Sequence, residues 1–507
     1  MTGAASDLIR RGAPQGCLPF ERFLLTRPAF AALREALLQE PTLALLSMWA
    51  EPNAVHAAFF DEAPAGEGGG LLLATCPAEG SFPALSPARP GAVRFERAIR
   101  DLWGLVAEDG VDLRPWLDHG RWGVTAPLAA KPSRDPVPPL QPAFLPVEGE
   151  GWHQIPVGPV HAGVIEPGHF RFSVQGETVV RLEQLLGYTH KGTLDLMLRK
   201  SPRVAARFAA RLSGDTTVAH SLAFALAAEA ACGIAAPPRA ALLRAVMLEL
   251  ERIANHLNDW GFICNDAAFA YPHARCGALR EGVLRANALA FGHRLMMDRV
   301  VPGGVALDLA PGAERVILAA LDAVEAELPQ LLRIYETHAS LQDRVVGTGI
   351  LKPELAALFA AGGHVGRASG RGFDARQALP HTPYDALPVA SAVLTEGDVD
   401  ARVRVRIAEL KESLGLVRTL LGALEPGEIA ATLPQRGGEG IAVVEGFRGE
   451  IVTWMALDDG GLIRGVFPRD PSWLQWPLLE AAIEGNIVAD FPLCNKSFNC
   501  SYSGVDL

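Results

Sequence analysis

Residues 213–262 have the apolar spacing of two consecutive helices. In the second half of this stretch, apolar residues recur at intervals of three and four, which predicts a helix with one buried stripe. They are Leu242, Leu243, Val246, Met247, Leu250, Ile253, Ala254 and Leu257. Gly233 suits the end of the first helix, and Pro237 and Pro238 suit the first turn of the second. Both helices are rich in alanine and leucine, so we expect buried surfaces, with candidate chemistry where the first helix begins, at residues 213–220.

Ahead of this pair, residues 1–125 have the pattern of a small α+β unit. A short helix is expected at residues 31–38, and short apolar runs predict strands at 42–49, 56–60 and 71–75. Residues 126–151 are dense in proline, which indicates an extended linker and a domain boundary.

Residues 152–507 form the second predicted domain, which opens with a hairpin around residues 176–177. Helices are expected at residues 278–298, 312–342 and 400–424, followed by strands at 441–445 and 450–457 and a helix at 473–484. Residues 403–407 alternate strictly and also fit a strand, but the apolar pattern that continues to residue 420 favours a helix. The predicted fold class is α+β: a small α/β domain, then a mostly α-helical domain with a short β-hairpin region.

Composition and charge narrow the functional classes. The chain has 507 residues, 49% hydrophobic and 20% charged, and its net charge of −11 with scattered Lys and Arg gives no reason to expect nucleic-acid binding. No apolar run reaches the roughly 18–20 residues of a membrane span, and the first residues lack the apolar core of a signal peptide. Seven widely separated cysteines predict free thiols in a reducing cytoplasm.

Two sets of motifs resemble subunits of one class of respiratory complex. Residues 95–114 resemble the signature of the small hydrophilic core subunit of complex I (NuoC type), with Ala98 at a position that is usually Glu. The residues kept from that signature are Glu96, Arg97, Asp101, Gly104, Asp112, Leu113 and Arg114.

Beyond the linker, six motifs resemble the quinone-site subunit of complex I (NuoD type) and its relative, the large subunit of membrane-bound group 4 nickel–iron hydrogenases. The motifs are GPVHAGVIEPGHFRF (158–172), QGE (175–177), GYTHKG (187–192), ELERIANHL (249–257), VPGGV (301–305) and GRASGRGFDAR (366–376). The EPGHFRF sequence and the fusion of both subunit types in one chain are most similar to the formate hydrogenlyase large subunit.

The resemblance implies a core subunit on the cytoplasmic side of the inner membrane, peripheral to it, that docks on a small iron–sulfur subunit and on membrane subunits. In the hydrogenases it also implies a nickel–iron centre held by two CxxC pairs. The corresponding positions here are Ser213, Thr216, Ser501 and Gly504. Because such a metal requires soft thiolate donors, we expect no nickel–iron centre and no cofactor bound by this chain itself. An iron–sulfur cluster is expected in the neighbouring subunit.

The complex I pattern also implies a histidine on the early hairpin and a tyrosine near the first helix, which together bind a quinone head group. His161 and His169 are candidates for the histidine, whereas the tyrosine would fall near Gly214 and is missing. His220 follows Thr216 by one turn and could point into the vacated cavity. Each histidine can also be a structural hydrogen-bond partner, and Asp215 can either cap the helix or relay protons.

Other polar residues of the second domain could belong either to a binding site or to structural contacts. We expect Arg367, Arg371, Asp374 and Arg376 to form a buried ion network. Residues Glu249, Glu251 and His256 lack the HExxH arrangement, which favours a polar contact between helices over a metal site. Cys494 and Cys500 are expected to be unpaired rather than to bind a metal.

The sequence therefore predicts a hydrogenase-derived subunit of a membrane-associated, complex I-like oxidoreductase. It would transfer electrons toward quinone or couple them to proton-pumping subunits, and any NADH would be bound by another subunit. The alternative is a redox-inactive scaffold of such a complex. An active nickel–iron hydrogenase remains only if the tail positions are misaligned.

Overall fold

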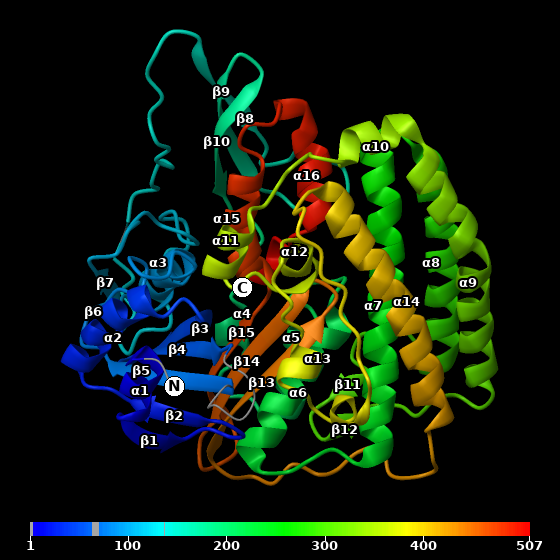
Figure 1. Ribbon diagram of the computed structural model, residues 1–507. Helices are drawn as coiled ribbons and strands as arrows, with labels where there is room; N and C mark the ends of the chain where they lie inside the picture. Colours follow the sequence, from blue (N-terminus) through cyan, green and yellow to red (C-terminus); the bar gives the residue numbers. More distant parts are fainter. Residues whose placement is uncertain (1–3, 63–69, 136) are drawn as a thin grey trace.

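The computed structural model of the protein describes residues 4–62, 70–135 and 137–507. Helices and strands are mixed throughout, so the predicted α+β class is confirmed (Figure 1). No helix within these described ranges is long and apolar enough to cross a bilayer.

The first part of the chain contains a five-stranded sheet in the order β1-β2-β5-β4-β3. β2 and β5 run parallel, and the other neighbours run antiparallel. The strands are β1 (Ala13–Gly16), β2 (Glu21–Leu24), β3 (Leu43–Glu51), β4 (Ala54–Asp61) and β5 (Gly70–Pro77), and the helices are α1 (Ala4–Arg10), α2 (Arg27–Gln39) and α3 (Ala92–Trp103). A short parallel pair joins β6 (Ser81–Pro83) to β7 (Val106–Glu108). The helix and three strands predicted before residue 76 are confirmed as α2, β3, β4 and β5.

Within the described part of residues 109–151, the chain forms no helix and no named strand. An antiparallel sheet in the order β10-β9-β8 follows, from β8 (Trp152–Val157), β9 (His169–Gln175) and β10 (Thr178–Leu185). The hairpin predicted around residues 176–177 is confirmed as β9–β10, and β8 adds a third strand.

Long helices form most of the remaining body, and α7, α8, α9 and α14 run side by side (Figure 1). The helices are α4 (Thr193–Met197), α5 (Pro202–Ala209), α6 (Thr217–Cys232), α7 (Pro238–Asp266), α8 (Ala270–Phe291), α9 (Ala313–Thr337), α10 (Ala339–Val345), α11 (Pro353–Leu358), α12 (Gly363–Ala368), α13 (Ala375–Ala378), η1 (Tyr384–Ala386) and α14 (Val399–Gly422), with a small hairpin from β11 (Val300–Val301) and β12 (Gly304–Val305). The alternating residues 403–407 lie in α14, so the strand interpretation is wrong. The single helix expected at 312–342 is two, because His338 leaves the helical conformation and its side chain caps α10 at Leu341 N.

Helix α6 lies directly on a C-terminal antiparallel sheet, β13-β14-β15. Its strands are β13 (Gly438–Gly446), β14 (Gly449–Leu457) and β15 (Ile463–Arg469). A Cβ atom on Gly438 would lie 2.1 Å from the Ala231 carbonyl oxygen, and one on Gly440 would lie 2.2 Å from the Ala227 carbonyl oxygen. The two glycines therefore let helix and strand backbones touch, and α6 is buried along nearly its whole length.

Replacement of Gly440 by alanine is expected to lower the free energy of unfolding by about 1–3 kcal/mol, because backbone atoms of α6 have to move to admit the methyl group. Urea unfolding followed by circular dichroism measures the change. Gly415→Ala in the exposed face of α14 is the control, since a Cβ there would meet nothing within 4 Å. It is expected to add up to about 1 kcal/mol of stability. Loss of stability in both variants would contradict the close approach at Gly440.

One hydrophobic core runs through the N-terminal sheet and the C-terminal sheet. The rings of Trp49 and Trp454 lie 5.6 Å apart between centroids, and Phe95 stacks on Trp473 at 4.9 Å. The chain ends with α15 (Ser472–Ala482), η2 (Val488–Asp490), α16 (Phe491–Phe498) and α17 (Ser503–Asp506), and its last residue, Leu507, is buried. The C-terminal tail is thus part of the core.

Candidate functional site

A cavity of about 500 Å³ lies where the turn before α6 meets the C-terminal tail. The loop after β8, residues 213–215, Arg448 and residues 491–503 contribute its walls. Its lining residues are Val157, His161, Ala162, Val164, Ile165, Glu166, Ser213, Gly214, Asp215, Asp266, Arg448, Phe491, Pro492, Asn495, Lys496, Asn499, Cys500, Ser501, Tyr502 and Ser503. Segments almost 300 residues apart in sequence therefore meet here, since Ser213 and Ser501 are 288 positions apart.

The four positions at which the resemblance places the family's thiolates lie in one hydrogen-bond network. The hydroxyl oxygens of Ser213 and Ser501 are 2.9 Å apart, and the Gly504 amide donates to the Ser501 hydroxyl at 3.0 Å. Ser213 and Thr216 each donate a hydroxyl hydrogen to Asp215 Oδ1, both at 2.9 Å. Their hydroxyl groups are thus bonded to protein atoms.

Arg448 brings a buried positive charge to this network. Its guanidinium donates to both carboxylate oxygens of Asp215 and, at 2.7 Å, to the Thr216 hydroxyl oxygen. It also lies over the Phe447 ring, 4.5 Å from the centroid. Burial acts to raise the pKa of Asp215, but the charge and hydrogen bonds of Arg448 outweigh burial, so this pKa lies well below its usual range. Asp215 is therefore an ionised partner of Arg448 at neutral pH.

A carboxylate fills the space where a side chain at position 504 would lie. A Cβ atom on Gly504 would be 2.8–2.9 Å from atoms of the Asp470 carboxyl group. His220 Nε2 donates to Asp470 Oδ2 at 2.9 Å, and both side chains are buried. Burial tends to raise the pKa of Asp470, but the His220 hydrogen bond and charge outweigh burial, so the pKa falls below its usual value. His220 lies behind the cavity as the partner of Asp470 and does not line it.

Of the two hairpin histidines, His161 lines the cavity and His169 does not. His161 Nδ1 lies 3.2 Å from the Pro159 carbonyl oxygen, which can only accept, so Nδ1 carries the hydrogen. Its Nε2 then accepts from the Tyr502 hydroxyl at 3.3 Å. His169 instead lies beside Phe144, with Nδ1 3.4 Å from the Gly158 carbonyl oxygen, and burial lowers its pKa.

Sequence reasoning missed three residues of this region: Arg448, Asp470 and Tyr502. Arg448 and Asp470 follow strand ends and belong to none of the quoted motifs. The sequence could have indicated Tyr502, because it follows Ser501 directly in a tail already assigned to the site. It supplies a buried phenol to the cavity although the family's own tyrosine position is near Gly214.

The residues at these positions do not fit a nickel–iron centre. They offer three hydroxyl groups and one glycine, which has no donor side chain. A soft metal requires thiolates, and a buried guanidinium beside the site repels a metal cation. Cys500 lines the cavity and Cys494 lies nearby in α16, and both are free and buried. Burial raises the pKa of Cys494 to about 11 and that of Cys500 further, so both thiols stay protonated.

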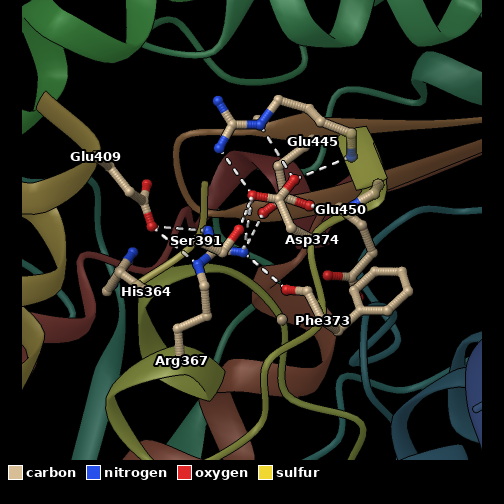
Figure 2. A network of polar contacts seen from close by, with 12 residues as sticks. His364, Arg367, Phe373, Asp374, Ser391, Glu409, Glu445 and Glu450 are labelled. Carbon is tan, nitrogen blue, oxygen red and sulfur yellow. Dashed lines mark hydrogen bonds and ion pairs between the residues drawn. The ribbon is translucent and has the colours of Figure 1, made fainter. Parts of the chain in front are cut away.

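A buried ion network surrounds Arg367 (Figure 2). The Arg367 guanidinium donates to Glu409 at 2.8 Å and to Glu445 at 2.9 Å, and it lies 3.6 Å from Asp374. Arg376 pairs with Asp374 at 2.7 Å and with Glu249 at 3.3 Å. The predicted network is confirmed for Arg367, Asp374 and Arg376.

For Arg371 the prediction is wrong, because this residue is not part of the network around Arg367. Its guanidinium pairs with Glu62, just after β4, at 2.7 Å and lies over the Phe373 ring. The backbone turns at Gly370, where φ is +87°, and this directs the Arg371 side chain toward the N-terminal sheet.

The acidic residues of α7 make polar contacts between elements, as predicted. Both carboxyl oxygens of Glu251 accept from the first turn of α6, at Val218 N and Ala219 N. Thr216 makes no side-chain cap, so Glu251 satisfies these amides. Burial raises the pKa of Glu251 to about 8. His256 bonds Glu409 at 2.8 Å, and in the described ranges no three His, Cys, Asp or Glu side chains are grouped to hold a metal.

Known proteins of two related kinds are similar to this chain. The family of the respiratory-chain NADH dehydrogenase 49 Kd subunit matches residues 269–437. Formate hydrogenlyase subunit 5 of Escherichia coli K12 is 29% identical over 438 residues, 84% of this chain and 77% of that protein. An NADH-quinone oxidoreductase subunit of Roseiflexus sp. is 29% identical over 70% of this chain and 98% of that protein. The solved structure of an archaeal membrane-bound sulfane sulfur reductase shares the fold, with a TM-score of 0.67 at 23% identity over 72% of this chain and 100% of that one.

One relative reaches 30% identity over most of its length. The alpha subunit of the membrane-bound hydrogenase of Pyrococcus furiosus is 30% identical over 376 residues, which are 70% of this chain and 88% of that protein. The chain therefore belongs to the family that comprises these subunits of membrane-bound hydrogenases and the 49 Kd-type subunits of NADH-quinone oxidoreductases.

Proposed function

We propose that this chain is the cavity-bearing core subunit of a membrane-bound, complex I-like oxidoreductase, and that its cavity receives a quinone head group instead of a nickel–iron centre. One observation carries the proposal: the four thiolate positions are a hydroxyl–carboxylate–guanidinium network, with the Asp470 carboxylate where a side chain at 504 would lie. The partners are a small iron–sulfur subunit, which holds the cluster that delivers electrons, and membrane subunits. The complex lies on the cytoplasmic side of the inner membrane.

The cavity suits a quinone by size and by chemistry. Its volume of about 500 Å³ is in the usual range for small-molecule sites. The lining includes the apolar side chains of Val157, Ile165 and Phe491, which can pack against a ring. The Tyr502 hydroxyl, whose hydrogen bonds His161 Nε2 in this structure, can turn that hydrogen to a carbonyl oxygen of the ligand. Reduction of a quinone to a quinol takes two electrons from the neighbouring cluster and two protons, and Tyr502 with His161 would hold one of these protons.

A redox-inactive scaffold is the second candidate, and a specific observation favours it. The polar groups nearest the thiolate positions already bond one another, and the low pKa of Asp215 makes it a poor proton donor. Such a cavity can serve to hold the tail and α6 in place while it transmits conformational change to ion-pumping subunits.

Experiments on the intact purified complex test both candidates. We expect nickel far below one atom per chain by plasma mass spectrometry, and turnover of a short-chain quinone with an artificial electron donor. Tyr502→Phe and His161→Phe are expected to lower kcat/KM by roughly tenfold or more, because the first removes the hydroxyl that donates to the carbonyl and the second removes the imidazole that orients this hydroxyl. His169→Phe is the control, since His169 lies outside the cavity, and its rate is expected to stay within about twofold.

Three outcomes decide between the candidates. Stoichiometric nickel would overturn the proposal. An assembled complex without quinone turnover would establish the scaffold. Equal losses in the His169 variant and the cavity variants would place the quinone elsewhere.

A further inference from the structure

A second cavity, of about 470 Å³, lies where the N-terminal part of the chain meets the C-terminal helix α15. Its walls come from α3, from residues 112–119 and 140–145, from β10 and from α15. The quinone cavity and this one share no lining residue. Nothing in the proposed function uses this second cavity.

Positive charge is in excess along its walls. Four guanidinium groups line it, from Arg94, Arg97, Arg114 and Arg181, against three carboxylates, from Asp112, Glu183 and Glu480. His119 adds no charge at neutral pH, because burial and then the Arg97 charge lower its pKa. The lining therefore carries one positive charge more than negative charge.

Three nitrogen atoms on these walls also lack a hydrogen-bond partner among the described residues: Arg94 Nη1, Arg181 Nε and His119 Nε2. Of these, Arg181 Nε lies 3.5 Å from Glu183 Oε2 as part of an ion pair. Arg94 is the most constrained of the three residues, with 5% of its surface exposed. Its other terminal nitrogen donates to Glu480 at 3.0 Å and to Gln184 at 3.2 Å, and the guanidinium lies 4.6 Å from the centre of the Trp116 ring. A buried guanidinium hydrogen without an acceptor is costly, and a ligand oxygen would satisfy it.

Apart from Gln141 and Gln184, the rest of the lining is apolar. Its larger apolar side chains include Val93, Leu140, Phe144, Leu185, Phe359 and Pro477. An inorganic ion would leave these surfaces in contact with water, whereas an aromatic or aliphatic body would cover them.

We propose that this cavity is a binding site for a small organic monoanion, in which a carboxylate-type group meets Arg94 and Arg181 and an apolar body packs against Phe144 and Phe359. The single excess charge matches one negative charge on the ligand. Because Arg94 also binds Glu480 of α15, the anion joins the first part of the chain to this C-terminal helix.

Calorimetric titration of the full-length chain with benzoate tests the site, with uncharged benzamide and inorganic phosphate as comparison probes. We expect one benzoate per chain, weakened at higher salt, and no saturable binding of benzamide. Arg94→Gln is expected to weaken benzoate at least about tenfold, through the loss of a charge-assisted hydrogen bond. Arg181→Gln, whose side chain is 32% exposed, is expected to weaken it in the same direction without a folding risk.

Arg285→Gln is the matched control, because that arginine is exposed on α8 and far from the cavity lining. The proposal is overturned if benzoate does not bind saturably, if benzamide binds as tightly, or if Arg94→Gln and Arg181→Gln bind benzoate like the Arg285 control. Binding of phosphate without benzoate would overturn the apolar part of the site.

Discussion

Replacement of Arg367 by methionine is expected to lower the free energy of unfolding by about 3–5 kcal/mol, the range found when one partner of a buried ion pair is removed. Arg367 is fully buried and is shared by Glu409, Glu445 and Asp374. Methionine fills much of the same volume but leaves these carboxylates with less positive charge than they need. Urea unfolding at constant pH measures the loss.

The loss is expected to be larger at pH 8 than at pH 5. Burial acts to raise the pKa of Glu409, but Arg367 and then His256 outweigh it and hold that pKa well below its usual value. Without Arg367 the pKa rises, so the folded variant takes up a proton as the pH falls, and protonation relieves the buried charge. In the unmodified protein the pKa of Glu445 is already about 7, because burial and then Asp374 raise it, so at pH 5 Arg367 faces one carboxylate fewer.

Arg418→Met is the control for this experiment. Arg418 lies on α14, the helix of Glu409, and pairs with Asp322 and Glu325 at the surface. Its loss is expected to cost less than about 1 kcal/mol. Equal losses for both variants, or a loss at Arg367 that does not change with pH, would contradict the network as described.

Gly504→Cys, which introduces a cysteine at one of the positions where the resemblance places a thiolate, is expected to destabilise the protein by about 2–4 kcal/mol. The new Cβ would lie 2.8–2.9 Å from the Asp470 carboxyl, so that carboxyl must move and its bond to His220 is strained or lost. Thermal unfolding measures the loss of stability. Incubation of the variant with nickel, followed by metal analysis, is expected to show no stoichiometric uptake.

Ser501→Cys is the matched control, because it introduces the same residue three positions earlier without a backbone or carboxylate clash. It weakens only the hydroxyl contacts with Ser213 and Gly504, so a loss of about 1 kcal/mol is expected. A Gly504 variant as stable as the Ser501 variant would show that the tail has room for the family's thiolate.

The sequence predicted those helix ends and turns that depend on residues close together in the chain. Gly233 ends α6 in the left-handed conformation, with φ of 64°, and Pro238 begins α7. The stripe of α7 and the turn after β9 follow from apolar spacing and turn residues. β15 was missed because its seven residues include Gly465 and Pro468, which weaken the strand signal, and it forms through pairing with β14.

The candidate site was less accessible to sequence reasoning for geometric reasons. Extending helical periodicity from Thr216 to His220 suggested that His220 points into the cavity. Thr216 is not helical, with φ of −123° and ψ of 33°, so the periodicity begins after it and His220 turns toward Asp470. Arg448 and Asp470 reach the site from the ends of β13 and β15, and only tertiary packing brings such single charged residues together.

The aromatic contacts between the N-terminal and C-terminal parts of the chain have a consequence for assembly. In this chain Trp49 meets Trp454, and Phe95 meets Trp473, within one polypeptide. Because both surfaces belong to one chain, their contact is intramolecular and does not depend on the amount of protein in the cell. The NADH-quinone oxidoreductase relative from Roseiflexus is matched over 98% of its length by only 70% of this chain. In this chain, the two parts that form the contact are synthesised together in a one-to-one ratio. Dilution therefore cannot separate them.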